Sequence, residues 1–294
     1  MAILDPDLRR TWIFGPGADL TAHDAMLESG ADALIADLED FTPPEKRGEA
    51  RRLLGRFIQG CRNHRRLAAI RINALEGDGM IDLAAAMETR PDVIAYPMTN
   101  SAAQMHCLHV AMTHWEGVLG VAENSTEILP VCETALGIVE VRTIAGGSPR
   151  IRCALLGAED LANDLCAERS ADAIELDYAR RRFVLEARAA RIEPIDAPYT
   201  FSDVDGAVRE ARLARRLGYR SKSLVRPEHA RALNDVLTPS PDELTRAQAI
   251  VDGFDAARAR GEDRALVNGL WVEVPTYRNA RRLIGRAHRL GLGA

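Results

Sequence analysis

Two carboxylates in this sequence stand directly after apolar segments. The segment LPVCETALGIV (129–139) is typical of a buried parallel strand that leads into a helix, yet it carries Glu133 where the apolar run ends. Asp160 is the second polar residue, after Glu159, that follows the apolar part of IRCALLGAED (151–160). A carboxylate at the edge of a core is costly unless another group pairs with it. Glu133 and Asp160 are therefore candidates for one shared site.

Carboxylates that meet in one place repel each other and raise one another's pKa unless a cation neutralises them. The sequence offers no cluster of His or Cys beside these two residues. Oxygen ligands favour a hard cation, so we predict that Glu133 and Asp160 bind Mg²⁺, with Mn²⁺ as an alternative. Each carboxylate alone is also compatible with a structural role, as an N-terminal cap of the following helix.

Eight short segments rich in Ile, Val, Leu and Ala are typical of buried strands. They are 11–17, 31–40, 67–73, 92–98, 127–133, 151–160, 193–199 and 220–225. The segments between them carry apolar residues at helical spacing. Alternation of strands and helices predicts parallel strands joined by crossover helices. Eight such units predict a closed (β/α)₈ TIM barrel, with an open doubly wound sheet as the alternative.

In such a barrel, functional groups project from the C-terminal ends of the strands. Several carboxylates, Asp196 among them, are expected at that mouth, together with Arg71, Lys222 and Arg226. We predict catalytic roles for three of these residues: Arg71, Glu39 and Asp37. We predict that the substrate is bound by Pro16, Gly17, Asn73, Glu159, Lys46, Tyr199 and Arg226.

The alternation of strands and helices stops after residue 226. We therefore predict two parts, a barrel over residues 1–228 that carries the metal site and a helical C-terminal extension over 229–294 that acts as a flap or lid. Within the extension, the segment ALVNGLWVEVP contains glycine, tryptophan and proline. It is expected to form a covering flap or a short extra strand.

The bulk composition excludes several classes of protein. The formal net charge of −5 argues against nucleic acid as a partner, since phosphate binding requires a basic surface. The five cysteines form no CxxC pair, which indicates neither a disulfide framework nor a zinc site and suits a reducing cytoplasm. No apolar run is long enough to span a membrane, and the start MAILDPDLRR has no signal-peptide pattern.

Seven motifs, in order along the chain, resemble one known family. They are RRTWIFGPG, ADALIADLEDFTPPEKRGEAR, IRIN, CETALGI, LGAEDLANDL, LGYRSKSLVRPEH and NGLWVEVP. The chain is similar to the citrate lyase β-subunit-like branch of the HpcH/HpaI aldolase superfamily, which includes malyl-CoA and citramalyl-CoA lyases. The resemblance covers nearly the whole length.

The resemblance implies an oligomeric (β/α)₈ barrel, a trimer or hexamer, that cleaves or forms carbon–carbon bonds next to a carbonyl with Mg²⁺. By position, Glu133 and Asp160 correspond to the metal ligands, and Arg71 to the arginine that polarises the carbonyl and stabilises the enolate. GLWVEVP corresponds to a flap that closes over a neighbouring subunit and brings an aspartate to the site. Here that residue is Glu273, which keeps the carboxylate on a longer side chain.

Two positions depart from the family pattern. Met98 stands where the family has lysine, and VRPEH, with Arg226 and His229, replaces IHPxQ. Both lie where the family handles the acyl-CoA partner or shapes the pocket. We therefore predict a Mg²⁺-dependent carbon–carbon lyase acting on a small 3-hydroxy acid or its CoA thioester, without naming citrate as the substrate.

Three alternatives to this prediction stay open. A family member with the same groups could hydrolyse the thioester of a malyl-CoA-like substrate. Lys222 could form a Schiff base, which would require a desolvated lysine with a lowered pKa. The chain could also be a non-catalytic barrel subunit, since a fold alone does not define a function.

Overall fold

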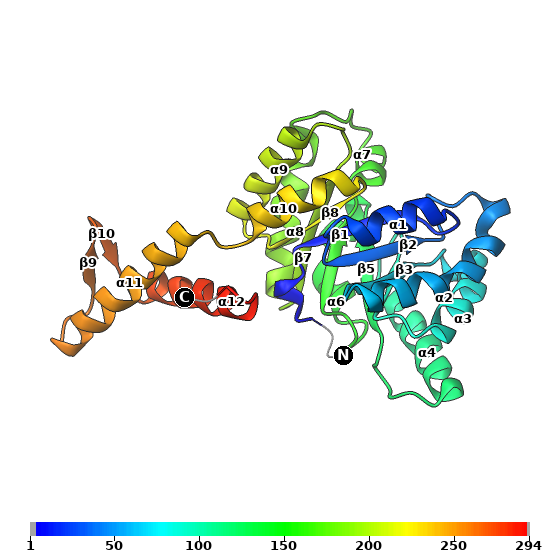
Figure 1. Ribbon diagram of the computed structural model, residues 1–294, viewed down its shortest axis with the longest axis horizontal. Coiled ribbons are helices and arrows are strands. Elements are labelled where there is room, and N and C mark those ends of the chain that lie inside the picture. Colours follow the sequence, from blue (N-terminus) through cyan, green and yellow to red (C-terminus); the bar gives the residue numbers. More distant parts are fainter. Residues whose placement is uncertain (1–3, 293–294) are drawn as a thin grey trace. The chain divides into compact units, whose positions relative to one another are not determined.

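The structure is a computed structural model that describes residues 4–292. Eight parallel strands close into a barrel in sequential order, and the last strand pairs back to the first (Figure 1). This confirms the predicted (β/α)₈ fold. The strands are β1 (Thr11–Pro16), β2 (Ala33–Asp37), β3 (Leu67–Arg71), β4 (Val93–Tyr96), β5 (Glu127–Cys132), β6 (Cys153–Leu156), β7 (Glu193–Tyr199) and β8 (Ser221–Leu224).

Helices connect the strands and cover the outside of the barrel (Figure 1). They are α1 (Leu20–Glu28), α2 (Arg47–Asn63), α3 (Met80–Glu88), α4 (Ala102–Leu119), α5 (Ala135–Val139), α6 (Val141–Ala145), α7 (Glu159–Asp164), α8 (Asp177–Ala189), α9 (Val204–Leu217) and α10 (Ala230–Leu237). Local signals set their ends. A capping box of Ser101 and Gln104 begins α4, and Gly120, with a φ of 62°, ends it.

The period of two along each strand divides the apolar residues into two cores. One set, which includes Phe14, Val131 and Leu155, fills the inside of the barrel. The alternate set packs between the strands and the helices. The same parity places Asp37 with Ala33 and Ile35, on the inner face, at the point where β2 ends.

Lys222 belongs to the outer set, so it does not reach the barrel mouth as expected from the sequence. Its Nζ donates to Asp196 Oδ2 (2.7 Å), to the carbonyl of Ala197 (2.5 Å) and to Glu210 Oε2 (3.0 Å). Arg180 of α8 binds both oxygens of Asp196, at 2.9 and 2.7 Å. This buried network fastens β7 and β8 to α8 and α9.

The chain divides into two compact units, one up to Leu237 and one from Thr238 onward. The predicted boundary, after residue 228, lies before α10. The second unit contains α11 (Pro241–Ala259), β9 (Ala265–Val267), β10 (Leu270–Val272) and α12 (Val274–Arg289). Its small core is formed by Phe254, Ala257, Ala265 and Val272. The segment ALVNGLWVEVP thus contains an antiparallel pair of strands rather than a single one.

Two general features of the sequence can be compared with residues 4–292. No helix in this part of the chain is both long and apolar enough to cross a membrane. All five cysteines are free thiols, and Cys61, Cys132 and Cys153 are buried.

Candidate active site

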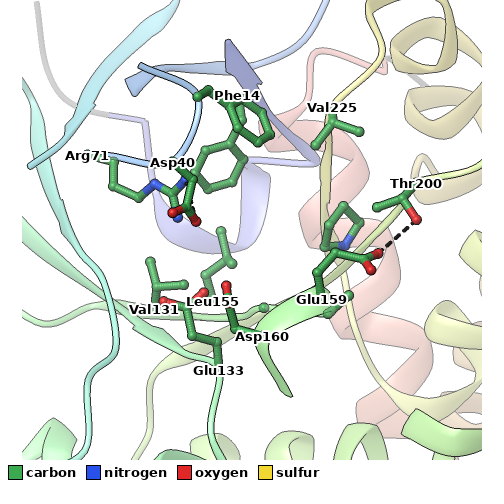
Figure 2. Close-up of a pocket in the computed structure, with 14 residues that line it drawn as sticks. Phe14, Asp40, Arg71, Val131, Glu133, Leu155, Glu159, Asp160, Thr200 and Val225 are labelled. Atoms are coloured by element: carbon green, nitrogen blue, oxygen red, sulfur yellow. Dashed lines mark hydrogen bonds and ion pairs between the residues drawn. The ribbon is translucent and has the colours of Figure 1, made fainter. Parts of the chain in front are cut away.

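A cavity of about 350 Å³ opens at the C-terminal ends of the barrel strands. Figure 2 shows charged side chains around it, with Arg71 beside Asp40, Glu133 beside Asp160, and Glu159 joined to Thr200. The lining residues are Phe14, Asp40, Phe41, Arg71, Val131, Glu133, Leu155, Gly157, Ala158, Glu159, Asp160, Pro198, Thr200 and Val225. The cavity therefore combines one arginine, four carboxylates and an apolar surface.

Arg71 is the last residue of β3 and is paired in register with Asp37, the last residue of β2. The guanidinium binds Asp37 with both ends of its fork, from Nε to Oδ1 (2.8 Å) and from Nη2 to Oδ2 (2.5 Å). Its Nη1 lies 2.8 Å from a carboxylate oxygen of Glu39. Burial opposes the charge, yet Asp37 and Glu39 together keep the pKa of Arg71 above its ordinary value. Arg71 is thus a permanent positive charge with a fixed orientation.

Glu133 directly follows β5 and is almost completely buried. Its Oε1 accepts a hydrogen bond from the backbone N–H of Met98 (2.7 Å). Burial raises the pKa of Glu133 to about 8, against the opposing effect of Arg71. Asp160 adds to this rise, which indicates that the two carboxylates lie within electrostatic reach of each other. Glu133 and Asp160 also line the same cavity, so the fold brings the two carboxylates to one place.

Asp160 lies in the first turn of α7 and is half-buried. Burial, and then the carboxylate of Asp40, raise its pKa. Its neighbour Glu159 differs in environment, since it is exposed and accepts hydrogen bonds from Thr200 (2.9 Å) and Arg169 (3.1 Å). Asp160 has no such side-chain partner among the residues that the structure describes.

Glu39 lies next to Arg71 at the end of β2. Burial raises the pKa of its carboxyl group to about 7, although Arg71 opposes the shift, and Asp40 and Asp37 raise it further. A carboxyl group with a pKa near the working pH can accept and return a proton, which is the property of a general acid or base.

The residues present fit a magnesium ion. Among residues 4–292 no group of three or more His, Cys, Asp or Glu side chains is arranged to hold a metal. Mg²⁺ does not require one, because it is usually held by one or two carboxylates plus water and substrate oxygens. Glu133 has room for its second oxygen because residue 157 is glycine, where a Cβ atom would lie 2.6 Å from Oε2. Glu133 and Asp160 would be the two protein ligands.

Several residues predicted to bind the substrate do not line the cavity. Asn73 donates to the carbonyl of Leu38 (2.8 Å) and to Asp82 (2.7 Å), and so ties the end of β3 to the loop after β2. Tyr199 is buried, and its hydroxyl donates to Asp203 Oδ2 (2.5 Å) at the start of α9. Both side chains are hydrogen-bonded to other residues of the barrel and do not line the cavity.

The remaining predicted contacts also lie outside the cavity lining. Pro16 is the last residue of β1, and Gly17, which follows it, donates its N–H to the carbonyl of Asp37 at the end of β2 (2.9 Å). Lys46 is exposed, and Nη1 of Arg226 lies 3.5 Å from Oε1 of Glu228. Glu273 is exposed at the start of α12 in the second unit.

Sequence reasoning missed several residues that line the cavity. Asp40 follows Glu39 in the same LED motif and could have been included on that ground. Phe14 shares the inward parity of Trp12 on β1, which was also visible in the sequence. Phe41 and Thr200 lie in loops, where no periodicity indicates the direction of a side chain.

Fold and site together define a class of protein: a (β/α)₈ barrel that brings a buried arginine and two metal-competent carboxylates to the C-terminal ends of its strands. The chain belongs to the HpcH/HpaI aldolase/citrate lyase family, whose sequence model matches residues 10–227.

Individual proteins of known name are similar to this chain over nearly all of its length. Citrate lyase subunit beta of Haemophilus influenzae is 30% identical over 282 residues, which cover 95% of this chain and 97% of that protein. L-malyl-CoA/beta-methylmalyl-CoA lyase of Cereibacter sphaeroides is 29% identical over 304 residues, covering 96% and 95%. The structure of CitE from Mycobacterium tuberculosis in complex with magnesium, acetoacetate and coenzyme A superposes with a TM-score of 0.76 at 25% identity, covering 98% of this chain and 100% of that chain.

Proposed function

We propose that this protein is a Mg²⁺-dependent carbon–carbon lyase that acts on a small 3-hydroxy acid or its CoA thioester. The observation that carries the proposal is the meeting of Glu133, Asp160 and Arg71 around one cavity at the barrel mouth. The related malyl-CoA lyase and the CitE structure with magnesium and coenzyme A support the choice of metal and of substrate class.

When bound, Mg²⁺ would supply a Lewis acid for the oxygens of the oxo-acid half of the substrate. Cleavage removes the proton of the 3-hydroxyl group, breaks the bond between C2 and C3, and leaves the electron pair on C2 as an enolate. Arg71 faces the cavity with a charge that Asp37 holds in place, so it stabilises this enolate without reorganisation.

Proton transfer requires a group that titrates near neutral pH. Glu39, with its pKa of about 7, is suited to accept the hydroxyl proton. Glu273 of the second unit is the other candidate, and it would protonate the enolate carbon when the flap closes. A flap that closes over a neighbouring subunit requires a homo-oligomer, and we propose a trimer or hexamer. The free cysteines suit a protein of the reducing cytoplasm.

The test is incubation of purified protein with malyl-, citramalyl- and related 3-hydroxyacyl-CoA thioesters, first with Mg²⁺ and then with EDTA. Metal-dependent release of an oxo acid and an acyl-CoA would support the lyase. Release of free CoA and a 3-hydroxy acid would instead show that the protein is a thioesterase. The variant Glu133→Gln should lose the metal-dependent activity, whereas no turnover by any form would favour a non-catalytic subunit.

A further inference from the structure

The surface of the cavity is divided by polarity. Its carboxylates and Arg71 are accompanied by an apolar wall built from Phe14, Phe41, Val131, Leu155, Pro198 and Val225. Phe14, Val131 and Leu155 form part of the barrel's inner core, so this part of the wall is rigid. The apolar and the charged side chains thus face one cavity of about 350 Å³.

The charges of the cavity do not favour a substrate with two carboxylates. Among the lining residues that the structure describes, Arg71 is the only cation, and it is already bound to Asp37 and Glu39. A divalent ion on Glu133 and Asp160 would compensate only those two carboxylates. Glu159 is paired with Arg169 (3.1 Å), but Asp40 shares Arg71 with Asp37 and Glu39, so the negative charge around Arg71 would still repel a second carboxylate of the substrate.

Phe41 is the member of the apolar wall closest to solvent. It is 40% exposed, although a large aromatic side chain gains most from being buried. Its ring lies edge-on to Phe14, with 6.3 Å between the centroids, and 5.8 Å from Cζ of Arg71. Its backbone N–H donates to Asp37 Oδ2 (3.1 Å), which anchors the loop to the site. Phe41 therefore presents a fixed apolar face beside the arginine.

From this division we infer that the oxo-acid half of the substrate carries an uncharged alkyl side chain, and that Phe41 selects for it. The inference rests on the proposed lyase function and specifies its substrate class. The alkyl group packs against Phe41 and Phe14, while the oxo-acid oxygens face Glu133 and Asp160.

The experiment is calorimetric titration of the Mg²⁺-loaded full-length protein with oxo acids, with ligand-observed NMR for weak ligands. One series lengthens the alkyl chain, through glyoxylate, pyruvate, 2-oxobutanoate and 2-oxopentanoate. Two matched pairs replace a terminal methyl group by a carboxylate, namely 2-oxobutanoate with oxaloacetate and 2-oxopentanoate with 2-oxoglutarate. We expect about fourfold tighter binding for each added methylene. Each dicarboxylate should bind at least about tenfold more weakly than its methyl partner.

The variant Phe41→Ala should reduce the gain per methylene to about twofold or less. Phe201→Ala is the matched control, because Phe201 is a similarly exposed aromatic residue (36%) outside the cavity lining. Circular dichroism would verify that both variants fold. Equal binding across the alkyl series, or tighter binding of the dicarboxylates, would overturn the inference and leave the lyase intact. If Mg²⁺ binds but no oxo acid does, both the inference and the proposed function fail.

Discussion

Arg71 and Asp37 end two adjacent strands in register and form a two-pronged ion pair inside the barrel. Asp37 is fully buried, and its oxygens also accept the backbone N–H groups of Glu39 (2.9 Å) and Phe41 (3.1 Å). One carboxylate thus orients the arginine and shapes the loop that carries Asp40 and Phe41, which both line the cavity.

The variant Asp37→Asn should therefore impair both activity and folding. Loss of a buried partner leaves Arg71 less well compensated, and we expect about 3 kcal/mol less stability in urea unfolding. Because Arg71 would no longer be held in place, kcat/KM should fall about 100-fold. Asp24→Asn is the control, since Asp24 and Arg56 form an exposed pair that should contribute at most about 1 kcal/mol. Equal stability of the two variants would contradict this account.

Magnesium affinity should depend on pH. Since the pKa of Glu133 is raised to about 8 in the metal-free protein, protons compete with the metal below that pH. Apparent affinity should weaken by up to about tenfold per pH unit as the pH falls from 8 to 6, with proton release on binding. Calorimetry in buffers of different ionisation enthalpy measures both quantities.

Variants of two adjacent acids test which of them binds the metal. Asp160→Asn should abolish measurable Mg²⁺ binding, because it removes one of two protein ligands. Glu159→Gln should retain it, because Glu159 is turned toward Thr200 and Arg169. Loss of Mg²⁺ binding in Glu159→Gln, with binding retained in Asp160→Asn, would instead make Glu159 the metal ligand.

The two lysines of the chain offer a matched pair. Lys222→Met should lower stability by about 3 kcal/mol, because it leaves the buried carboxylates Glu210 and Asp196 with Arg180 as their one remaining cation among the described residues. Lys46→Met should change the free energy of unfolding little, since Lys46 is exposed.

Treatment with borohydride in the presence of substrate should leave the wild-type protein unmodified at Lys222. A borohydride-stable adduct, detected by mass spectrometry, would restore the Schiff-base alternative.

Acid should weaken the same network. Burial opposes the ionisation of Asp196, yet Arg180 and Lys222 hold its pKa below the ordinary value. Since the folded-state pKa is the lower one, ionised Asp196 stabilises the fold above pH about 4, and this contribution is lost as the pH falls through the folded-state pKa. The difference in unfolding free energy between wild type and Asp196→Asn should therefore shrink between pH 5 and pH 3, as followed by urea titration. A constant difference would contradict this.

Much of the fold could be predicted because each strand is a short apolar run between helical segments, and eight of these have one common closed arrangement. The positions of Glu133 and Asp160 followed from the same pattern, since each carboxylate stands where an apolar run ends. Arg71 and Arg226 were both expected at the strand ends, and the resemblance to the family pointed to Arg71.

What the sequence left undetermined was the direction of side chains. Asp196 and Lys222 are near the ends of their strands, but the alternation along β7 and β8 turns both toward the helices. Tyr199 was expected to bind substrate, whereas its hydroxyl is bonded to Asp203. Phe41 lies in a loop held by the side chain of Asp37, four residues earlier, and no periodicity along such a loop indicates the direction of its ring.

The pairing of β1 with β8 also bears on how the chain is made. Thr11 pairs with Lys222, so about 210 residues of synthesis separate the two edges of this seam. At about 5–20 residues per second, β1 waits roughly 10–40 s on the ribosome for its second neighbour. During that time it presents an open apolar edge of the kind that promotes aggregation. Biosynthesis of this barrel should therefore depend on chaperones more than its finished stability suggests.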